Sequence, residues 1–491
     1  MFIILLVPVA FPLLLGAWAL FRVASWVRRF SGVVSSAAIL GSGIVAVLLG
    51  QGSAPLSSAG ILRADTLSAY MLAVVGAVGL VATWGGLAPR EADAPVHTEV
   101  GGAPRGMYAA LVCVFLSAMS LAVLADNLGV MWVAIEATTI ATAFLVGHNR
   151  TRRSLEAAWK YVILAPAGVA IAFLGIVLIY ASSTGTSTPT LSWVALTQMH
   201  LHLDPALVRV GAALAVLGFA TKAGLAPMHS WLPDAHSQAP APVSALMSGV
   251  LLSVALYSIL RIQAVANAVI GAEFLRALLV AGSLLSLAIA AALLLRQRDY
   301  KRMLAYSSIE HMGVMALGAA VGPTALPAVL LYILSHGLIK ASLFILAGRL
   351  LTAEGTPIIS DVRSLLARRP GLAVPWLIGI VALVGFPPFG IFFSEVGIIL
   401  AGWGTGMGVI MAVALALMLV IFAGITRLTV GMMFGSADQP DPHAESALDR
   451  SPHGPIVPLV LALGGCAIIP FVSGPIGSVL SDAAVALSRT R

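Results

Sequence analysis

Long uninterrupted apolar runs constrain the fold of this chain more than any other feature of its sequence. They follow one another from end to end, so that 59% of the 491 residues are hydrophobic and only 10% are charged. A soluble domain carries roughly 25% charged residues and cannot enclose this much apolar surface in one core. In lipid every backbone polar group must be satisfied within the protein, which leaves α-helices and closed barrels. Since the runs lack the period-2 alternation of barrel strands, the sequence predicts an all-α, polytopic membrane protein.

The apolar runs predict about 14 transmembrane helices, each long enough to cross ~30 Å of hydrocarbon. The expected spans lie near residues 1–21, 31–50, 66–88, 107–125, 128–148, 157–181, 206–226, 242–263, 272–295, 301–321, 325–350, 373–402, 405–434 and 455–480. No charged segment precedes the first run, MFIILLVPVAF, as one would in a cleavable signal peptide, so we expect a retained first helix. The linkers are too short for a separate soluble domain.

Basic residues are divided unevenly between the two sets of loops that 14 helices define. One set holds 18 of the 27 Lys and Arg residues and the other holds 6, while Lys160, Lys222 and Lys340 lie inside helices. Cytoplasmic loops carry the basic excess, so we expect both termini outside, in a bacterial inner membrane. Arg63 and Arg261 belong to the smaller, outer set. The net charge of +7 is dispersed over short loops, which argues against a nucleic-acid partner.

Several ionisable side chains lie inside the apolar runs, where a charge costs ~2.5–3.5 kcal/mol on insertion scales. They are Glu136, Lys222, His311, His336, Lys340 and Glu395. A buried Glu136–Lys222 pair could simply hold two helices together, and His311 could be a core histidine. Glu310, near the loop end of its helix, is expected to be solvated or structural, and Lys160 lies near the cytoplasmic edge, where its side chain could snorkel. So many membrane-centred positions in one chain nevertheless favour ion movement.

Prolines interrupt two of the predicted helices beside these residues. Pro227, Pro233, Pro240 and Pro242 follow Lys222, and the pair Pro387–Pro388 precedes Glu395. Each proline removes an N–H donor from the helix ladder. Broken helices in corresponding positions of two halves indicate a transport site between inverted repeats. The sequence therefore predicts helices 1–3 in residues 1–106, two inverted five-helix repeats in 107–263 and 272–434 with broken helices 7 and 12, and a C-terminal loop with helix 14 in 435–491.

The chemistry of these residues suits proton transfer. A carboxylate facing a lysine in low dielectric stabilises its charged form, so opening or closing a Glu136–Lys222 pair would switch proton binding at Lys222. Histidines and water can relay the proton laterally. His229, His236 and Asp234 could be imagined as metal ligands, but the proline-broken backbone and the open ligand set favour a water-lined role. Cys113 and Cys466 form no C-x-x-C motif, so no iron–sulfur centre is expected in this chain.

The stretch TKAGLAPMHSWLPDAHSQAPAPVSALMSGVLL resembles the signature of the antiporter-like, proton-pumping membrane subunits. This family is shared by respiratory complex I, membrane-bound hydrogenases and cation/proton antiporter complexes. AYSSIEHMG, SHGLIKASLF and FPPFGIFFSE are similar to three further blocks of the family, and the resemblance spans roughly residues 107–434. WVAIEATT and LEAAWKY are most similar to the hydrogenase-4 component F branch.

The resemblance implies a proton pathway when it is carried over position by position. Ser253 stands where many complex I relatives have a lysine, so the link between Lys222 and Lys340 would depend on water, Ser253 or His311. The expected pathway residues are Glu136, Lys222, His229, Ser253, His311, His336, Lys340 and Glu395.

The function that the resemblance implies is proton translocation by a subunit without redox cofactors of its own. Its complex would resemble a group-4 hydrogenase, a formate hydrogenlyase or complex I. The expected partners are other membrane subunits, the lipid bilayer and a peripheral redox arm, with iron–sulfur and nickel–iron centres only in those partners. A sodium/proton antiporter subunit is the alternative, because Glu136 and Glu395 could serve sodium. Ser253 leaves open a structural subunit with a degenerate pathway.

Overall fold

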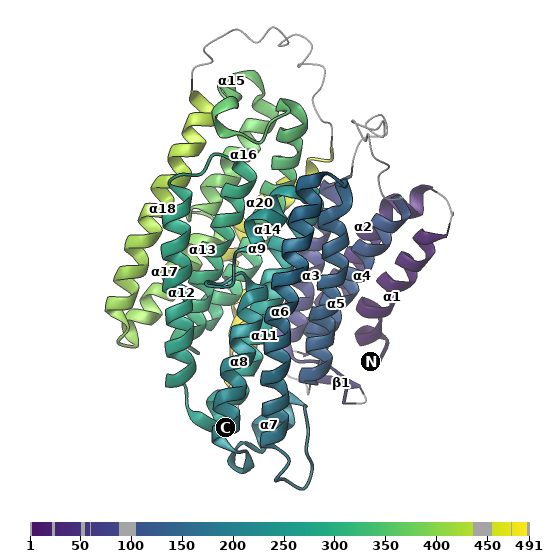
Figure 1. The fold of residues 1–491 in the computed structure, drawn as a ribbon, viewed down its shortest axis with the longest axis vertical. Helices are drawn as coiled ribbons and strands as arrows, with labels where there is room; N and C mark the ends of the chain where they lie inside the picture. Colours follow the sequence, from purple (N-terminus) through teal and green to yellow (C-terminus); the bar gives the residue numbers. More distant parts are fainter. Residues whose placement is uncertain are drawn as a thin grey trace.

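The computed structural model describes residues 2–21, 25–50, 55–58, 60–87, 105–435, 454–472 and 474–488. It confirms a predominantly helical, polytopic membrane protein, with most helices running along the long axis of the molecule (Figure 1). Within the described part of the chain the only sheet is a two-stranded antiparallel ribbon, β1 (Leu56–Ser58) and β2 (Leu62–Ala64).

Eleven described helical segments are long and apolar enough to cross a membrane. They are α1 (Phe2–Leu20), α2 (Ser25–Gly50), α3 (Thr66–Gly85), α4 (Arg105–Leu124), α5 (Leu128–Val146), α6 (Arg152–Ser182), α8 (Pro205–Ala223), the continuous segment of α10 (Ala241–Leu246), a π-helical turn (Met247–Leu251) and α11 (Leu252–Ile270), α12 (Glu273–Leu294), α14 (Leu326–Glu354) and α18 (Gly408–Phe434). Short elements connect them, namely α7 (Trp193–Gln198), α9 (Trp231–Gln238), α15 (Leu365–Arg368) and the 3₁₀ turns Gly147–Asn149, His200–His202 and Ile359–Asp361.

Three further expected spans depart from a straight apolar helix. α13 (Tyr300–Val321) contains three charged residues, and the expected span 373–402 is divided into α16 (Pro370–Leu383) and α17 (Gly390–Gly404). The last expected span consists of α20 (Val457–Ile468), the 3₁₀ turn Ile469–Phe471 and α21 (Pro475–Ser488), bent by 81°. A single helix over 455–480 is therefore wrong, because Pro470 and Pro475 interrupt its hydrogen-bond ladder. The count of 14 spans stays a prediction.

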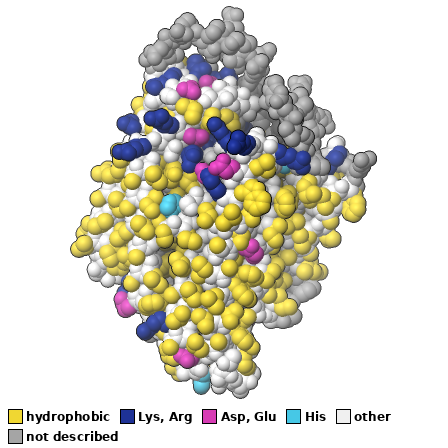
Figure 2. All heavy atoms as spheres, in the orientation of Figure 1, with side chains coloured by type: hydrophobic (Ala, Val, Ile, Leu, Met, Phe, Trp, Pro, Cys, Tyr) yellow, Lys and Arg dark blue, Asp and Glu magenta, His cyan; other side chains and the backbone are white. Residues whose placement is uncertain are grey.

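Hydrophobic side chains cover the flank of the molecule, and Lys and Arg gather at one end (Figure 2). Phe144, Leu400 and Leu419 are each about two-thirds exposed, as expected for side chains that face lipid rather than water. The basic end lies near α15 at the top of Figure 1, whereas α7 and β1 lie at the opposite, arginine-poor end. The basic loops thus gather at one end of the bundle, and the placement of that end in the cytoplasm stays a prediction.

Helices α6 and α8 approach so closely that only small residues fit between them. A Cβ atom added to Gly175 would lie 2.4 Å from the carbonyl oxygen of Gly211, and one added to Gly218 would lie 2.4 Å from the backbone nitrogen of Ala172. Lipid provides no hydrophobic force between helices, so such backbone contact is a principal source of association. This packing fixes the end of α8, which carries Lys222, against α6.

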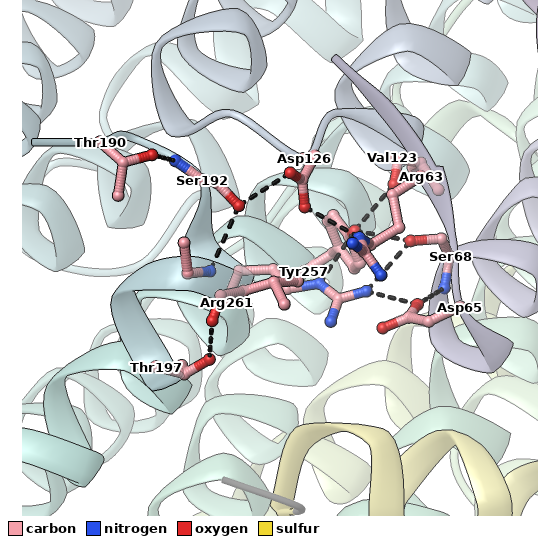
Figure 3. Close-up of polar contacts among 12 residues, drawn as sticks. Arg63, Asp65, Ser68, Val123, Asp126, Thr190, Ser192, Thr197, Tyr257 and Arg261 are labelled. Carbon is pink, nitrogen blue, oxygen red and sulfur yellow. Dashed lines mark hydrogen bonds and ion pairs between the residues drawn. The ribbon is translucent and has the colours of Figure 1, made fainter. Parts of the chain in front are cut away.

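A buried polar network ties α3, α4 and α11 together at the arginine-poor end (Figure 3). Arg261 of α11 donates to Asp65 at 2.6 Å and to Tyr257 and Ser68 at 3.0 Å, and Tyr257 donates to the carbonyl of Val123. Arg261 has no exposed surface, so its assignment to an outer loop is wrong. α11 continues to Ile270, so Arg261 lies inside this helix, and its guanidinium lies among Asp65, Ser68 and Tyr257.

Asp65 is the carboxylate that makes the buried charge of Arg261 tolerable. It caps α3 by accepting from the backbone N–H of Ser68 at 2.8 Å. Burial raises the pKa of Asp65, but the Arg261 guanidinium and the Ser68 N–H outweigh burial and hold that pKa below its usual range. The pair therefore stabilises the fold above the unfolded pKa of about 3.9, and that contribution is lost as the pH falls.

We expect Asp65→Asn to lower the free energy of unfolding by about 3–5 kcal/mol at pH 7, because it leaves a buried guanidinium without its counter-charge. The measurement is denaturation of the purified chain in detergent. The matched control is Glu273→Gln, which removes the carboxylate from an exposed pair with Arg276 and should cost less than about 1 kcal/mol. Equal losses in the two variants would contradict the assignment.

Candidate functional site

The break after Lys222 is built from a left-handed glycine and a tryptophan clamp. Gly224 ends α8 with φ of +73°, a conformation that side chains with a Cβ rarely adopt. Beyond the break, Trp231 at the start of α9 donates its indole N–H to the carbonyl of Thr221 at 2.9 Å. The same carbonyl also accepts from the backbone N–H of Gly224 at 3.3 Å, so the tryptophan adds a second bond at the end of α8. Lys222 is thus held at the end of a helix inside the bundle.

Lys222 is completely buried and is held by hydroxyl groups. Its Nζ donates to Thr139 Oγ1 of α5 at 2.7 Å and to the Tyr161 hydroxyl of α6 at 2.6 Å. Nζ also lies 4.7 Å from the centre of the Tyr161 ring, which favours a cation. Thr142 donates to the same Tyr161 hydroxyl at 2.7 Å. Three helices therefore converge on this ammonium.

Glu136 reaches Lys222 through Thr139. The Thr139 hydroxyl contacts Glu136 Oε2 at 3.2 Å and is itself the acceptor for Lys222 Nζ at 2.7 Å. The salt bridges of the described residues include none between Glu136 and Lys222, so this structure shows the two charges bridged by the Thr139 hydroxyl, and opening and closing of the pair stays a prediction. The physical reason is spacing: Thr139 lies one turn beyond Glu136 on the same face of α5 and occupies the position between them.

Lys340 forms the centre of a second cluster, between α14 and α13. It is completely buried, and its Nζ donates to the carbonyl of Leu304 at 2.7 Å and to Ser307 Oγ. Like Lys222, it is bound by neutral oxygens. The two lysines thus occupy chemically similar environments in the two halves of the chain.

A hydrogen-bonded chain leads from His311 to Glu395 through an intervening tyrosine. His311 Nδ1 lies 2.6 Å from the Tyr332 hydroxyl, and that hydroxyl donates to Glu395 Oε1 at 2.9 Å. His336, one turn beyond Tyr332 on α14, lies with its ring centre 5.3 Å from that of His311. Glu395 stands in the second turn of α17, directly after the break that separates this helix from α16. A proton can be exchanged along this chain by hydroxyl and imidazole groups.

Glu310 belongs to the same cluster, so the expectation of a solvated side chain is wrong. It is 6% exposed, and its Oε2 lies 3.9 Å from His311 Nε2. The reason is its place in the helix: α13 has 22 residues, nearly all of them buried, and Glu310 stands at its middle rather than near a loop. One atom from each of Glu310, His311 and Glu395 lies within 4.8 Å of the others, so these three side chains could hold a cation.

The three residues considered as metal ligands, His229, Asp234 and His236, do not point toward one common site. Asp234 pairs at 3.0 Å with Lys160 and with Arg302 near the basic end of the bundle. His236 is buried instead against Phe344 of α14, with ring centres 5.1 Å apart. His229 is half-buried in the segment between α8 and α9, outside both hydrogen-bonded clusters.

Ser253 does not reach across to either lysine, since its hydroxyl donates within its own helix to the carbonyl of Gly249 at 3.3 Å. Ser248, in the π-helical turn, makes the contact between helices instead, with its Oγ 2.8 Å from that of Ser308 on α13. Ser308 also donates to the Leu304 carbonyl, which accepts from Lys340. Lys340 is therefore connected to the π-helical turn through the Leu304 carbonyl, Ser308 and Ser248. This connection does not require a lysine in α11.

Sequence reasoning missed the hydroxyl groups that connect the charged residues. Thr139 and Tyr332 could have been found, because they lie one turn from Glu136 and His336 on the same helix faces. Tyr161 and Ser307 reach their lysines from other helices, and no spacing within one helix predicts such contacts. Their positions depend on how the helices pack.

The helical bundle and its enclosed charges together define the class: a polytopic membrane protein with ionisable side chains inside its bundle. We call these side chains the ionisable axis: Glu136, Lys222, Glu310, His311, His336, Lys340 and Glu395. The family model described as "NADH:quinone oxidoreductase/Mrp antiporter, TM" matches residues 125–422. The chain belongs to this family of antiporter-like membrane subunits.

Three relatives illustrate the range of the family. The chain is 38% identical over 354 residues to a hydrogenase-4 component F homologue of Methylacidiphilum infernorum, covering 71% of this chain and 72% of the relative. It is 26% identical over 480 residues to a subunit of the Na⁺/H⁺ antiporter of Alkalihalophilus pseudofirmus, covering 94% of this chain and 93% of the relative. Among solved structures, a chain of the archaeal membrane-bound sulfane sulfur reductase superposes with a TM-score of 0.86 at 26% identity, covering 99% of this chain and 98% of the other.

We expect Tyr161→Phe to lower the free energy of unfolding by about 1.5–3 kcal/mol, because the buried Lys222 ammonium loses one of its two acceptors. Denaturation of the purified chain in detergent measures the effect. Tyr180→Phe is the matched control on the same helix, since Tyr180 is 40% exposed, and it should change stability by less than about 0.5 kcal/mol. A Tyr161→Phe variant as stable as the control would show that the hydroxyl does not hold the lysine.

Proposed function

We propose that this chain translocates protons across the membrane as the non-redox subunit of a redox-driven complex. The observation that carries the proposal is the pair of completely buried lysines, each bound by neutral oxygens, with carboxylates flanking them at Glu136 and Glu395. A lysine held only by neutral acceptors can lose its proton without leaving an unpaired carboxylate in contact with it. Two such sites in series can bind and release protons in turn.

The hydroxyl chain supplies the local steps of proton transfer. On one side Thr139 connects Glu136 to Lys222, and on the other Tyr332 connects His311 to Glu395. Moving one charge against 100 mV costs ~2.3 kcal/mol. Rearranging one or two hydrogen bonds to a charged group is worth a comparable amount, so a change in hydration or helix position suffices to drive a step.

Two buried histidines lie beside the second cluster: His236 stacks on Phe344 of α14, and His336 lies one turn from Lys340 on the same helix. His236 and His336 have no exposed surface, and neither ring has a hydrogen-bond partner among the described residues. Buried polar groups are normally satisfied by protein or by ordered water. We propose that water joins Lys222 to Lys340 along these rings, with His229 at the edge of this route and Ser253 beside it.

The setting of the activity rests on the relatives. Components of hydrogenase-4 and subunits of NADH-quinone oxidoreductase are among the proteins similar to this chain. We propose that other membrane subunits and a peripheral redox arm accompany it, that the metal centres reside in those partners, and that both termini face outside in a bacterial inner membrane. The two halves, 107–263 and 272–434, would act as inverted repeats whose broken helices carry Lys222 and Glu395.

We expect Lys222→Ala and Glu395→Gln each to reduce proton translocation per electron at least about tenfold, because each removes a proton-binding site. The measurement is proton uptake into vesicles that contain the reconstituted complex. Glu273→Gln, on the exposed start of α12, should leave the ratio unchanged. Unchanged ratios in both pathway variants would favour a structural subunit with a degenerate pathway.

We expect Tyr332→Phe to slow proton translocation at least about tenfold while the complex assembles normally, because it removes the hydroxyl between His311 and Glu395. The same vesicle assay measures the rate. Tyr306→Phe, a buried tyrosine on α13, is the matched control. Equal rates in the two variants would show that protons bypass Tyr332.

Sodium/proton antiport is the second proposal, and it rests on the cluster of Glu310, His311 and Glu395. Oxygen ligands suit a hard cation such as Na⁺, and one relative is named as an Na⁺/H⁺ antiporter subunit. A sodium gradient imposed on vesicles without any electron donor distinguishes the two functions. Antiport predicts proton movement that disappears in Glu310→Gln, whereas a redox-driven proton pump predicts none.

A further inference from the structure

A basic cavity lies at the arginine-rich end of the molecule, away from the ionisable axis. Its volume is about 460 Å³, and it lies between the α12–α13 turn, the Ile359–Asp361 turn and the last turns of α18. Three arginines from separate segments line it, together with a hydroxyl and the apolar surface of α18: Arg298, Arg363, Arg427, Ser360, Leu428 and Gly431.

None of the three arginines forms an ion pair within the described part of the chain. Arg363 donates to the Ser360 carbonyl at 2.9 Å, and Arg427 donates to the Leu295 carbonyl at 3.1 Å, so both are oriented by backbone groups. The neighbouring carboxylates are engaged elsewhere. Asp299 caps α13 through two backbone N–H groups, and Asp361 accepts from Thr356 and Ser360. Among the described residues, no carboxylate oxygen therefore pairs within 4 Å with any of the three guanidinium groups of the cavity.

The segments that carry the arginines are fastened to one another by backbone bonds. The N–H of Ile359 donates to the carbonyl of Arg298 at 2.8 Å, and the N–H of Tyr300 donates to that of Pro357 at 3.1 Å. Ser364 Oγ binds the carbonyl of Gly435 at 2.7 Å, next to the end of α18. The arrangement is thus formed in advance, which reduces the entropy lost on binding.

Apolar surface continues from the cavity along α18. Leu419 and Val420 of α18, which lie on the bilayer side of Arg427, are 67% and 38% exposed. Lys and Arg gather where the hydrophobic flank of the molecule ends (Figure 2). A ligand that fits both surfaces carries an anionic head beside hydrocarbon chains.

We propose that this cavity binds the headgroup of an anionic phospholipid from the cytoplasmic leaflet. Arginine matches phosphate oxygens with paired N–H donors, and basic pockets between helices on the cytoplasmic side are suited to such headgroups. A free phosphate would use the arginines but leave the neighbouring apolar surface of α18 uncovered. The acyl chains of a lipid would cover that surface. We therefore infer that the ligand is a lipid rather than free phosphate.

The test compares lipid binding by two charge-matched variants of the full chain in detergent. The site variant is R298A/R363A/R427A, and the control is R28A/R152A/R153A, which removes three exposed arginines at the same end. Native mass spectrometry titrates each protein with phosphatidylglycerol and with phosphatidylcholine. At about 1 kcal/mol per arginine, we expect the site variant to bind phosphatidylglycerol about a hundredfold more weakly than the control, with binding of phosphatidylcholine equal in both.

Equal phosphatidylglycerol affinity in the two variants would overturn the proposal. Displacement of the lipid by inorganic phosphate at concentrations similar to the lipid would also overturn it, since the site would then recognise phosphate alone. The acidic segment 436–453 lies outside the described residues and is the rival occupant. Phosphatidylglycerol binding that requires D438N/D441N/E445Q would assign the arginines to that segment and overturn the lipid site. Both variants should retain proton translocation, so this test is independent of the proposed function.

Discussion

The absence of hydrogen-bonding solvent in the bilayer is the constraint on which this structure depends. Every charge placed at depth must find its partners inside the protein, or it costs several kcal/mol. Arg261 meets the constraint with a carboxylate, and the result is a tight, buried ion pair that joins two helices. Lys222 and Lys340 meet it with hydroxyl and carbonyl oxygens. The charge of Arg261 is fixed by an opposite charge and stabilises the fold. The charges of the two lysines are held only by neutral oxygens, which is the basis of the proposed proton binding and release.

Helix breaks bring these partners within reach. Gly224 ends α8 two residues after Lys222, so the lysine stands at a helix end inside the bundle, where hydroxyls of α5 and α6 bind it. The second break places Glu395 in the second turn of a new helix, beside Tyr332. The close approach of α6 to α8 through Gly175 and Gly218 then sets the distance between Lys222 and Tyr161. Small residues and prolines therefore contribute to the chemistry of the axis as much as its charged groups do.

Relatives named for hydrogenases, NADH-quinone oxidoreductases and sodium/proton antiporters are all similar to this chain, so family membership alone does not separate the two proposed functions. The features that would distinguish these uses lie at opposite ends of the ionisable axis. Two carboxylates and a histidine meet at Glu395, whereas Lys222 is enclosed by hydroxyls. The basic cavity between α12 and α18 is a separate feature, tied to the leaflet rather than to the axis.

The sequence by itself determined the helical membrane fold, the two breaks and the placement of Lys222, Lys340 and Glu395 inside apolar runs, because apolar runs, prolines and charges at depth are local features of the chain. Tertiary structure decided the rest. It placed Thr139 between Glu136 and Lys222, buried Glu310 and Arg261, bent the last expected helix and brought Tyr332 to Glu395. Each of these depends on which faces of separate helices meet. Spacing within one helix places Thr139 beside Glu136 and Tyr332 beside His336, but it does not say which helix lies opposite.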